Sequence, residues 1–496
     1  MEASPQMNQQ EFSMPLGLRY NLGVADAIPS SRNLSQFLAS NASTFTPSNN
    51  VCRINVSSGQ FLDLKNAVLQ LDLKNTTSTD AIHLDGGADC VINRLRIVSS
   101  DGSEIERLDS YNQLTSVIDQ YTQGFGSLKT NAALKGGVAR LDDSPFMVAG
   151  DGTGGSNTAT GANGLVVAAS TGGTMSISNA VGGKGYDQKQ NDRLNASITR
   201  KYTFGLKGGF FNSTTSKLLP PNSPFQLEIT FDTAANCLVN VDGSNAVDYE
   251  VTNVELHVPA ITINDPAFMA RMNERMAQGL SWRANTYQHF VNTTNNSAGK
   301  DTIQIGARCR SLKGLMAIFR RQKLITNDDY FKLSRRSIQY IDDYQFKVGA
   351  QNYPVDRVNV AIGAVAGGTA SEARVHLSST DNLNVSEAYS QALRLMGNLN
   401  VANADTCVSV ESFCQSEINP NNGTGLACID LSAYSDGSVN SGINTLNNMP
   451  ISLEITKSTA ATDGAGDYTG NIQVDVYSVC ELVVMRLPSG VLASSY

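Results

Sequence analysis

The sequence predicts an all-β fold in which two related β-domains follow one another along the chain. The chain has 496 residues, too many for one ordinary hydrophobic core. Only 17% of the residues are charged and 42 are glycine, a composition typical of strands joined by turns rather than of helical bundles. Apolar and polar residues alternate with period two in several segments, and the heptad "PFQLEIT" (224–230) returns as "PISLEIT" (450–456).

The first 50 residues predict an extended N-terminal arm (1–50). They are rich in Pro, Ser and Asn and show little hydrophobic periodicity. They also lack a basic segment followed by an apolar core, so we expect no signal peptide and synthesis in the cytosol. No apolar run in the sequence approaches the roughly 20 residues that a membrane-spanning helix needs.

The first domain is predicted over residues 51–263. Its opening segment, "GQFLDLKNAVLQLDLKN" (59–75), alternates leucine with polar residues, which predicts strands with one buried face. The alternation changes phase between Leu64 and Leu69, which predicts a bulge or a bend at that point.

Further along the first domain, two strand-like runs in residues 90–108 flank the turn signal Asp101-Gly102. Residues 111–121 place apolar side chains at helical spacing, which predicts a short amphipathic helix. Strand patterns return in "KYTFGLKGGFF", "PFQLEITFDT" and "YEVTNVELHV", which complete the domain.

A Gly/Ser/Thr-rich insertion at about 150–185 interrupts the first domain. It contains no aromatic residue, and its only charged residues are Asp151 and Lys184. A disordered linker is one interpretation of this composition. Because "GLVVAAS" and "TMSISNAV" alternate enough for short strands, we favour a protruding loop with small hairpins of its own.

A linking helix is predicted over residues 264–280. Asn264 or Asp265 can serve as its N-cap, Pro266 suits the first turn, and Gly279 marks its end. Its apolar residues lie on one stripe: Phe268, Met269, Met272 and Met276. Such a stripe can form an adaptable binding face, but packing on the protein's own core is the more common outcome and the one we expect.

The second domain is predicted over residues 281–496, where the order of elements recurs. Strand–turn–strand material comes first, a helix over 386–397 follows, and strands at "ACIDLSAYSDG", "PISLEIT" and "IQVDVYSVCELVVM" close the chain. The heptad match alone is no proof, since about one such match is expected by chance in a chain of this length. The shared order of the flanking elements is what indicates a tandem duplication.

The search for a catalytic or metal-binding constellation gives no candidate. None of the eight cysteines forms a CxxC pair and there are only four histidines, so buried free thiols are expected rather than zinc ligands. "VGGKG" around Lys184 lacks the spacing of a phosphate loop, and residues 240–250 lack that of a calcium loop. We therefore assign no catalytic, metal-binding or cofactor-binding residue, expect no cofactor, and do not expect an enzyme.

One charge cluster lies in the second domain, although the whole chain has a net charge of −8. Its members are Arg308, Arg310, Lys313, Arg320, Arg321, Lys323, Lys332, Arg335 and Arg336. A basic surface facing a nucleic acid or an acidic neighbour is one interpretation. Solvated strand edges, on which Lys and Arg deter stray pairing, are the alternative that we favour, because no aromatic stacking pattern accompanies the charges.

Several fragments resemble the double jelly-roll major capsid proteins, the family of adenovirus hexon, tailless bacteriophage coats and large algal virus coats. "GQFLDLKNAVLQLDLK" is similar to the first strands in the Polinton-like virus and virophage branch, and "LLPPNSPFQLEIT" (218–230) to a late strand. "DYQFKVGAQNYP" (343–354) is similar to a strand and turn of the second domain. The N-terminal arm and residues 150–185 match no part of that family.

The resemblance implies two tandem eight-stranded jelly-roll β-sandwiches with a few short helices and long loop insertions. It also implies a structural role in the virion, in which homotrimers form pseudo-hexagonal capsomers that tile an icosahedral shell. Penton and minor capsid proteins would be further partners, specific nucleic-acid contact is not expected, and a membrane beneath the shell is left open. Residues 150–185 would be a tower or an intersubunit loop, and the arm would order against a neighbour or the shell interior.

Two other classes of protein stay open at this point. A β-sandwich adhesin, spike or carbohydrate-binding protein is the first alternative. Such sites usually present aromatic side chains on which sugars stack, and this chain has a single tryptophan, Trp282. An enzyme on a double-stranded β scaffold is the second, but its metal-ligand motif is missing. A stable trimer would indicate a capsid protein, glycan binding an adhesin, and copurified metal an enzyme.

Overall fold

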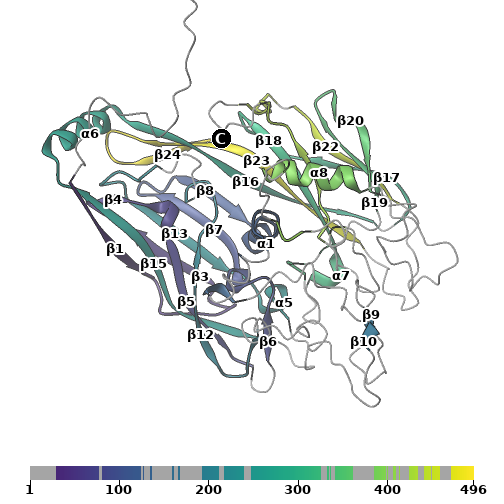
Figure 1. Ribbon diagram of the computed structural model, residues 1–496, viewed down its shortest axis with the longest axis horizontal. Coiled ribbons are helices and arrows are strands. Elements are labelled where there is room, and N and C mark those ends of the chain that lie inside the picture. Colours follow the sequence, from purple (N-terminus) through teal and green to yellow (C-terminus); the bar gives the residue numbers. More distant parts are fainter. Residues whose placement is uncertain are drawn as a thin grey trace, which may run out of the picture.

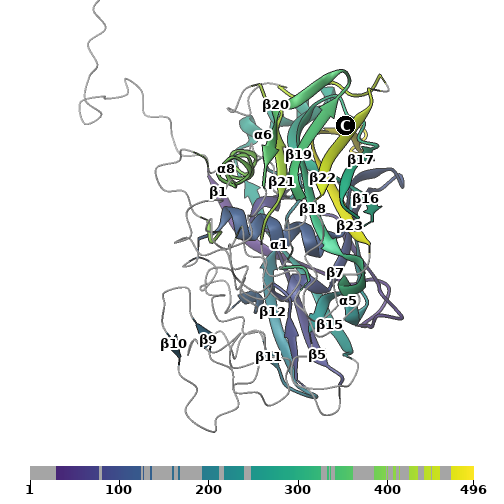
Figure 2. The same ribbon diagram turned by 90° about the vertical axis from the view of Figure 1, so that its right-hand side faces the viewer.

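The strands of the chain form two β-sandwiches that lie against each other, the first in purple and blue and the second in green and yellow (Figure 1). This computed structural model describes residues 29–77, 81–124, 193–211, 217–239, 247–295, 297–325, 341–360, 385–397, 424–433, 441–447, 449–457 and 471–496, together with short stretches that include 134–136, 332–334, 336 and 406–408. Figure 2 shows both sandwiches from the side.

The first sandwich packs two antiparallel sheets face to face. One sheet has the strand order β1 (Ser30–Leu38), β15 (Tyr249–Ile263), β5 (Val68–Asn75), β12 (Thr199–Gly205), with β2 (Thr44–Phe45) and β4 (Phe61–Leu62) also paired to β15. The other has the order β3 (Val51–Val56), β13 (Phe225–Phe231), β7 (Ile92–Ser99), β8 (Glu104–Asp109). A small third sheet joins β11 (Arg193–Leu194), β6 (Ile82–Leu84) and β14 (Leu238–Val239).

The second sandwich has the same construction. Its first sheet has the order β16 (Leu280–Thr294), β23 (Ile472–Arg486), β18 (Leu312–Arg321), β21 (Ala427–Asp430), with β24 (Leu492–Ser495) paired to β23. Its second sheet has the order β17 (Gly299–Ile305), β22 (Ile451–Lys457), β19 (Ile341–Val348), β20 (Gln351–Asn359).

The two sandwiches share one strand order. When the eight principal strands of each are taken along the chain, one sheet pairs the first, eighth, third and sixth, and the other the second, seventh, fourth and fifth. This is the double-sheet arrangement of a jelly roll, so the predicted fold class is confirmed. "PFQLEIT" lies in β13 and "PISLEIT" in β22, the seventh strand of each sandwich, as expected for a tandem duplication.

Alternation of side chains builds the core of each sandwich. In β5 the leucines 69, 71 and 73 are fully buried while the residues between them are half-buried, and β13 shows the same pattern. The predicted change of phase is confirmed: the 3-10 helix η2 (Leu64–Asn66) lies between β4 and β5 and turns the chain. The turn at Asp101-Gly102 is also confirmed, with Gly102 at φ +87° between β7 and β8.

The start of the fold differs from the sequence prediction. Residues 30–38, expected within the extended arm, form β1 and pair with β15 from Ser30–Ile263 to Leu38–Glu255. The first five residues of β1 are exposed, and the apolar side chains of Leu34 and Leu38 are 61% and 59% exposed. Backbone hydrogen bonds rather than burial hold this strand, so it lacks the hydrophobic alternation that reveals a strand in a sequence. Residues 1–28 lie outside the described part of the chain.

Two helices occupy equivalent places in the two sandwiches. α1 (Tyr111–Thr122) follows the fifth strand of the first sandwich, and α8 (Ser386–Leu395) follows the fifth strand of the second. Both were predicted, and Gly397 at φ +78° ends α8 as expected. The shorter helices are η3 (Ala88–Val91), α5 (Ala234–Cys237) and α7 (Gln322–Ile325). Within the described residues, no helix combines the length and apolarity needed to cross a membrane.

The linking helix α6 (Pro266–Gln278) is confirmed with its caps. The Asp265 carboxylate accepts hydrogen bonds from the backbone N–H groups of Ala267 (2.9 Å) and Phe268 (3.2 Å), and Gly279 follows the last turn at φ +90°. The apolar stripe packs less completely than expected, because only Met276 is buried. The helix lies at one end of the molecule, at the upper left of Figure 1.

Part of the 150–185 insertion is described. β9 (Ala159–Thr160) and β10 (Val166–Val167) pair in an antiparallel hairpin, and β10 lies in the predicted "GLVVAAS" run. The second predicted run, "TMSISNAV", lies outside the described residues.

Candidate functional site: the junction between the two sandwiches

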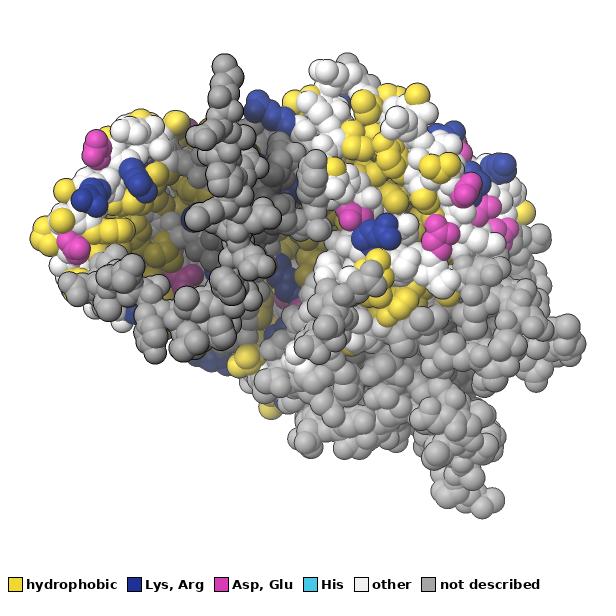
Figure 3. Space-filling view, turned by 45° about the horizontal axis from the view of Figure 1, so that its top comes forward, with side chains coloured by type: hydrophobic (Ala, Val, Ile, Leu, Met, Phe, Trp, Pro, Cys, Tyr) yellow, Lys and Arg dark blue, Asp and Glu magenta, His cyan; other side chains and the backbone are white. Residues whose placement is uncertain are grey.

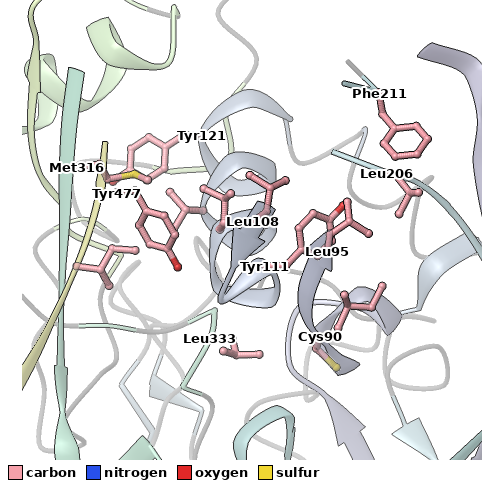
Figure 4. Packing of buried hydrophobic residues seen from close by; sticks show 14 of the residues in the cluster. Cys90, Leu95, Leu108, Tyr111, Tyr121, Leu206, Phe211, Met316, Leu333 and Tyr477 are labelled. Carbon is pink, nitrogen blue, oxygen red and sulfur yellow. The ribbon is translucent and has the colours of Figure 1, made fainter. Parts of the chain in front are cut away.

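The helix α1 lies at the junction where the two sandwiches meet. Figure 4 shows Tyr111 and Tyr121 of this helix together with Met316 and Tyr477 of the second sandwich. The Tyr477 hydroxyl donates to the carbonyl of Ser110, directly before the helix (3.1 Å). Ten of its twelve residues are buried, including polar ones such as Gln113 and Gln120. The sequence predicted a short amphipathic helix, with one polar face. In the structure the polar face is buried as well, so the helix packs against protein on all sides.

Polar side chains of α1 bond to the second sandwich. The Tyr121 hydroxyl donates to the carbonyl of Thr424 (2.9 Å), and the Gln120 side chain donates to the carbonyl of Ser334 (2.8 Å). Arg336, which is 1% exposed, donates to the Gln120 amide oxygen (2.6 Å). These bonds satisfy buried polar groups from both sandwiches at once, so separating the sandwiches would leave them unpaired.

Asp85 forms a second connection at the junction. It follows β6 in the first sandwich and is 1% exposed. Its carboxylate accepts hydrogen bonds from the backbone N–H groups of Lys332 (2.6 Å), Leu333 (2.7 Å) and Ser334 (3.0 Å), and from the Ser334 hydroxyl. Lys332 in turn donates its ammonium protons to the carbonyls of Ala235 and Leu238 in the first sandwich. Residues 332–334 of the second sandwich are thereby held against the first.

Glu106 forms the third connection, from β8. Its buried carboxylate accepts from the backbone N–H groups of Gly209 (2.7 Å) and Phe210 (2.8 Å) and from the hydroxyl of Thr286 on β16 (2.6 Å). Burial raises the pKa of Glu106 above its ordinary value, although these three hydrogen bonds oppose the shift. Gly209 is required here, since a Cβ would lie 2.6 Å from the Asn285 carbonyl oxygen.

The end of the chain forms the last connection. The backbone N–H of Leu492 on β24 donates to the Ser99 hydroxyl (3.1 Å), and the Tyr496 hydroxyl donates to the carbonyl of Ile105 (2.8 Å). At the end of β23, the Arg486 side chain donates to the Ser223 hydroxyl (2.9 Å). The C-terminal strand β24 therefore pairs with β23 of the second sandwich, while Leu492 and Tyr496 hydrogen-bond to the first sandwich.

The predicted basic cluster contributes to this junction rather than to a single surface. Lys332 and Arg336 are 0% and 1% exposed and make the contacts given above, and Arg320 is 6% exposed. Arg308 and Arg310 are exposed, and Lys313 donates to the Asn285 amide oxygen (2.9 Å). Both sequence interpretations, a basic surface and solvated strand edges, are therefore wrong for the buried members. Lys332 and Arg336 lie between β18 and β19, and their hydrogen-bond partners Ala235, Leu238 and Gln120 belong to the first sandwich.

Arg320 belongs to a buried charge network in the second sandwich. Its guanidinium donates twice to one oxygen of Asp475 (2.8 and 3.0 Å), and His289 contacts the other oxygen (3.0 Å). Asp475 is fully buried; burial alone would raise its pKa, but Arg320 and His289 together hold it well below the usual range. The His289 ring stacks on Tyr477, with ring centroids 4.6 Å apart, and the Tyr477 hydroxyl donates to the carbonyl of Ser110.

A second buried charge network lies beneath α1 in the first sandwich. Asp119 of α1 contacts the ammonium groups of Lys135 (2.6 Å) and Lys207, and Lys135 also contacts Asp89 (3.1 Å). Burial works to raise the pKa of Asp119, but the two lysines outweigh it and lower the pKa to about 2. The two positive and two negative charges balance, as buried charges must.

The described cysteines and the tryptophan that were considered for chemistry are buried. Seven of the eight cysteines are buried free thiols, as predicted, and Cys414 lies outside the described residues. In the described part of the chain, no group of three His, Cys, Asp or Glu could hold a metal ion. Trp282, the residue best suited to stack on a sugar, is only 9% exposed.

Exposed apolar side chains lie on the outer strands. Figure 3 shows hydrophobic side chains at the surface on both the left and the upper right of one face, among charged ones. Val355 on β20 is 84% exposed, and Val291 on β16 is 57% exposed. β20 is an edge strand of its sheet, as is β1 with Leu34 and Leu38. Unpaired strand edges with apolar side chains are typical of surfaces that associate with another chain.

Comparison with known proteins identifies the architecture. A scan against models of protein families and a search of curated proteins found no match to this sequence. VP54 of PBCV-1 is similar in structure over 96% of this chain and 99% of its own, with a TM-score of 0.56 and 11% identity. The Faustovirus major capsid protein matches over 94% and 92% (TM-score 0.55, 9% identity), and that of mavirus over 100% and 95% (TM-score 0.51, 9% identity).

The chain has the double jelly-roll fold. The similarity extends over both sandwiches and the junction between them, since the compared chains are covered almost completely. The similarity is one of fold, since the sequence identity is only 9–11%.

Proposed function

We propose that this protein is the major capsid protein of an icosahedral virus, and that its role is structural rather than catalytic. The single observation that carries the proposal is the pair of equivalent sandwiches with one strand order, joined through a buried junction. The structures that share this double jelly roll over most of their length include the major capsid proteins of Faustovirus and mavirus.

The geometry supports a trimer with pseudo-hexagonal shape. Each chain presents two sandwiches of the same construction, so three chains around a threefold axis present six. For six sandwiches to tile a shell, the two within a chain must keep a fixed orientation. The buried contacts of Asp85, Glu106 and α1 supply that rigidity, because any relative rotation would break several hydrogen bonds at once.

The contact surfaces between chains are proposed at the exposed outer strands. Heterologous contacts that close into a ring need two different surfaces on each chain. The edge strand β20, with Val355, and the edge strand β1, with Leu34 and Leu38, lie in different sandwiches and offer such a pair. Residues 150–185 are proposed as a tower or intersubunit loop, and residues 1–28 as an arm that contacts a neighbour or the shell interior.

The remaining partners follow from the same proposal. A shell of hexagonal tiles needs a different protein at its fivefold corners, so penton and minor capsid proteins are expected partners in the virion. The division of the chain into an arm, two jelly rolls and a linking helix at 264–280 is proposed on the same basis.

The experiment is the mass and shape of the purified full-length chain. Light scattering on a sizing column should give about three times the chain mass of 52.9 kDa, and electron microscopy should show hexagonal particles. A monomer that stays monomeric across a range of salt and protein concentrations would contradict the proposal. Binding to a glycan array in that same monomeric state would favour the adhesin alternative instead.

A further inference from the structure

Two cysteine thiols of the second sandwich lie closer together than ordinary packing allows. The Sγ atoms of Cys309 and Cys480 are 2.8 Å apart, and both residues are 0% exposed. Non-bonded heavy atoms pack at about 3.5–4.0 Å, while a disulfide bond measures about 2.05 Å. The distance between the two sulfurs is therefore shorter than a packing contact and longer than a disulfide bond, although the two residues are 171 positions apart in the sequence.

The backbone around each thiol is fixed independently of the sulfurs. The N–H of Cys309 donates to the Thr445 hydroxyl (3.0 Å), and its carbonyl accepts from the Thr445 N–H (3.0 Å). Cys480 lies in β23, paired with Thr286 of β16 on one side and Leu312 of β18 on the other. Closing the remaining gap of about 0.8 Å therefore requires only small side-chain rotations, not a movement of strands.

The pKa values of the two thiols are shifted in opposite directions, which indicates which cysteine reacts first in disulfide exchange. The hydrogen bond from Cys480 lowers the pKa of the Cys309 thiol, and the Thr445 hydroxyl acts in the same direction. That same hydrogen bond to Cys309, and after it burial, raises the pKa of Cys480. Because the thiolate is the nucleophile in disulfide exchange, Cys309 is the residue that attacks first.

We propose that Cys309 and Cys480 form an intramolecular disulfide when the protein meets a small-molecule disulfide oxidant, such as oxidised glutathione. The Cys309 thiolate attacks one sulfur of the oxidant, breaks its S–S bond and releases one thiolate. Cys480 then loses its proton and attacks Sγ of Cys309, forming the Sγ–Sγ bond and releasing the second thiolate. The two cysteines lose two electrons and two protons, and the oxidant becomes two thiols.

Cys90 and Cys237 of the first sandwich are a second buried pair of cysteines, and a hydrogen bond with Cys90 adds to the burial that raises the pKa of Cys237. The Cys237 thiol is directed at the carbonyl of Thr233 (3.3 Å), and the Cys407 thiol at that of Gln120 (3.2 Å). A thiol that donates to a carbonyl oxygen keeps its proton and is a weaker nucleophile than a thiolate. The bridge would tie the connection between β17 and β18 to the central strand β23, and its closure would be slow, on the order of hours, because both sulfurs are buried.

The test uses the full-length chain, purified with a reductant that is then removed. After incubation with oxidised glutathione, free thiols are alkylated in denaturant and counted by mass. Six of the eight cysteines should take the label, and the protein should be lighter by about 2 Da before alkylation. Cleavage after glutamate gives fragments 275–372 and 455–481, each with one cysteine of the pair, and these should be linked until dithiothreitol is added.

Variants assign the roles and control for misfolding. With Cys480→Ser the attacked intermediate cannot be resolved, so one glutathione should stay attached at Cys309, whereas Cys309→Ser should leave Cys480 unmodified. Cys428→Ser, a buried cysteine in the same sandwich, should form the bridge like the natural sequence. The bridge should raise the apparent Tm by about 5–10 °C.

Two results would overturn the proposal: eight labelled cysteines after prolonged oxidation, or a bridge elsewhere with Cys309 and Cys480 still alkylated. The measurement needs no assembly, so it succeeds or fails independently of the capsid role.

Discussion

Removing the Asp85 carboxylate tests whether the junction holds the two sandwiches together. Asp85→Ala removes the acceptor of four hydrogen bonds, three of them from consecutive backbone N–H groups of residues 332–334. The three N–H donors belong to residues that are 0–3% exposed, so water cannot replace the lost acceptor without opening the junction.

The magnitude follows from the number and kind of these bonds. Hydrogen bonds to a charged group contribute about 1.5–3 kcal/mol each, but the remaining groups relax partly when the carboxylate is lost. We expect Asp85→Ala to lower the free energy of unfolding by about 3–5 kcal/mol, the cost of breaking a buried polar network. Ser334→Ala removes only the hydroxyl donor and should cost about 1 kcal/mol.

The assay is urea unfolding followed by tryptophan fluorescence and by circular dichroism. Because Trp282 lies in β16 of the second sandwich, its fluorescence reports on that sandwich, while circular dichroism reports on both. The two curves should coincide for the natural sequence and separate for Asp85→Ala. Asp356→Ala, at an exposed position on β20, is the matched control. A change in Asp85→Ala no larger than that of the control, with coincident curves, would refute the reasoning.

Three further predictions concern buried charges and exposed edges. The pKa of Glu106 is higher in the folded than in the unfolded chain, so this residue makes the free energy of unfolding fall as the pH rises above the ordinary glutamate range. Glu106→Gln should weaken this pH dependence in urea titrations at pH 4.5–8. An unchanged dependence of the free energy of unfolding on pH would contradict the prediction. The lowered pKa of Asp119 stabilises the fold above the unfolded pKa of 3.8, and this stabilisation is lost as the pH falls toward about 2. Asp119→Asn should lower the free energy of unfolding by about 2 kcal/mol at pH 7 and should remove this loss of stability in acid. Val355→Asp should shift the sizing-column mass from trimer toward monomer, because it places a charge in the proposed contact on β20. Asn273→Asp adds the same charge at an exposed position of α6, outside both proposed contact strands, and should leave the trimer intact. Trimers of equal stability in both variants would place the contact elsewhere.

Most of the regular structure was predictable because local patterns report on burial. The leucines of β5 alternate with polar residues, and the core lies on one side of that strand, so the pattern and the structure coincide. α6 was predictable to within two residues at each end, since Asp265, Pro266 and Gly279 are local signals for a helix start and end. The duplication was predictable from the order of elements around two similar heptads.

The strand β1 and the burial of α1 were not predictable in the same way. β1 buries little, so the ladder to β15, more than 200 residues away in sequence, decides its conformation. Polar residues of α1 such as Gln113 and Gln120 would be expected to face solvent, yet their side chains form hydrogen bonds with the second sandwich. The basic residues 332 and 336 were misread for the same reason, because their partners lie in the other sandwich.

The sequence by itself determined the strands that bury one face, the capped helix α6 and the presence of two sister sandwiches, because each depends on residues that are neighbours along the chain. Only the tertiary structure decided how the two sandwiches join, and that Cys309 and Cys480 meet. Those contacts link residues 171 or more positions apart, as with Asp85 and residues 332–334 or the two thiols. Periodicity and turn signals extend over a few residues, so they carry no information about which distant groups a fold brings together.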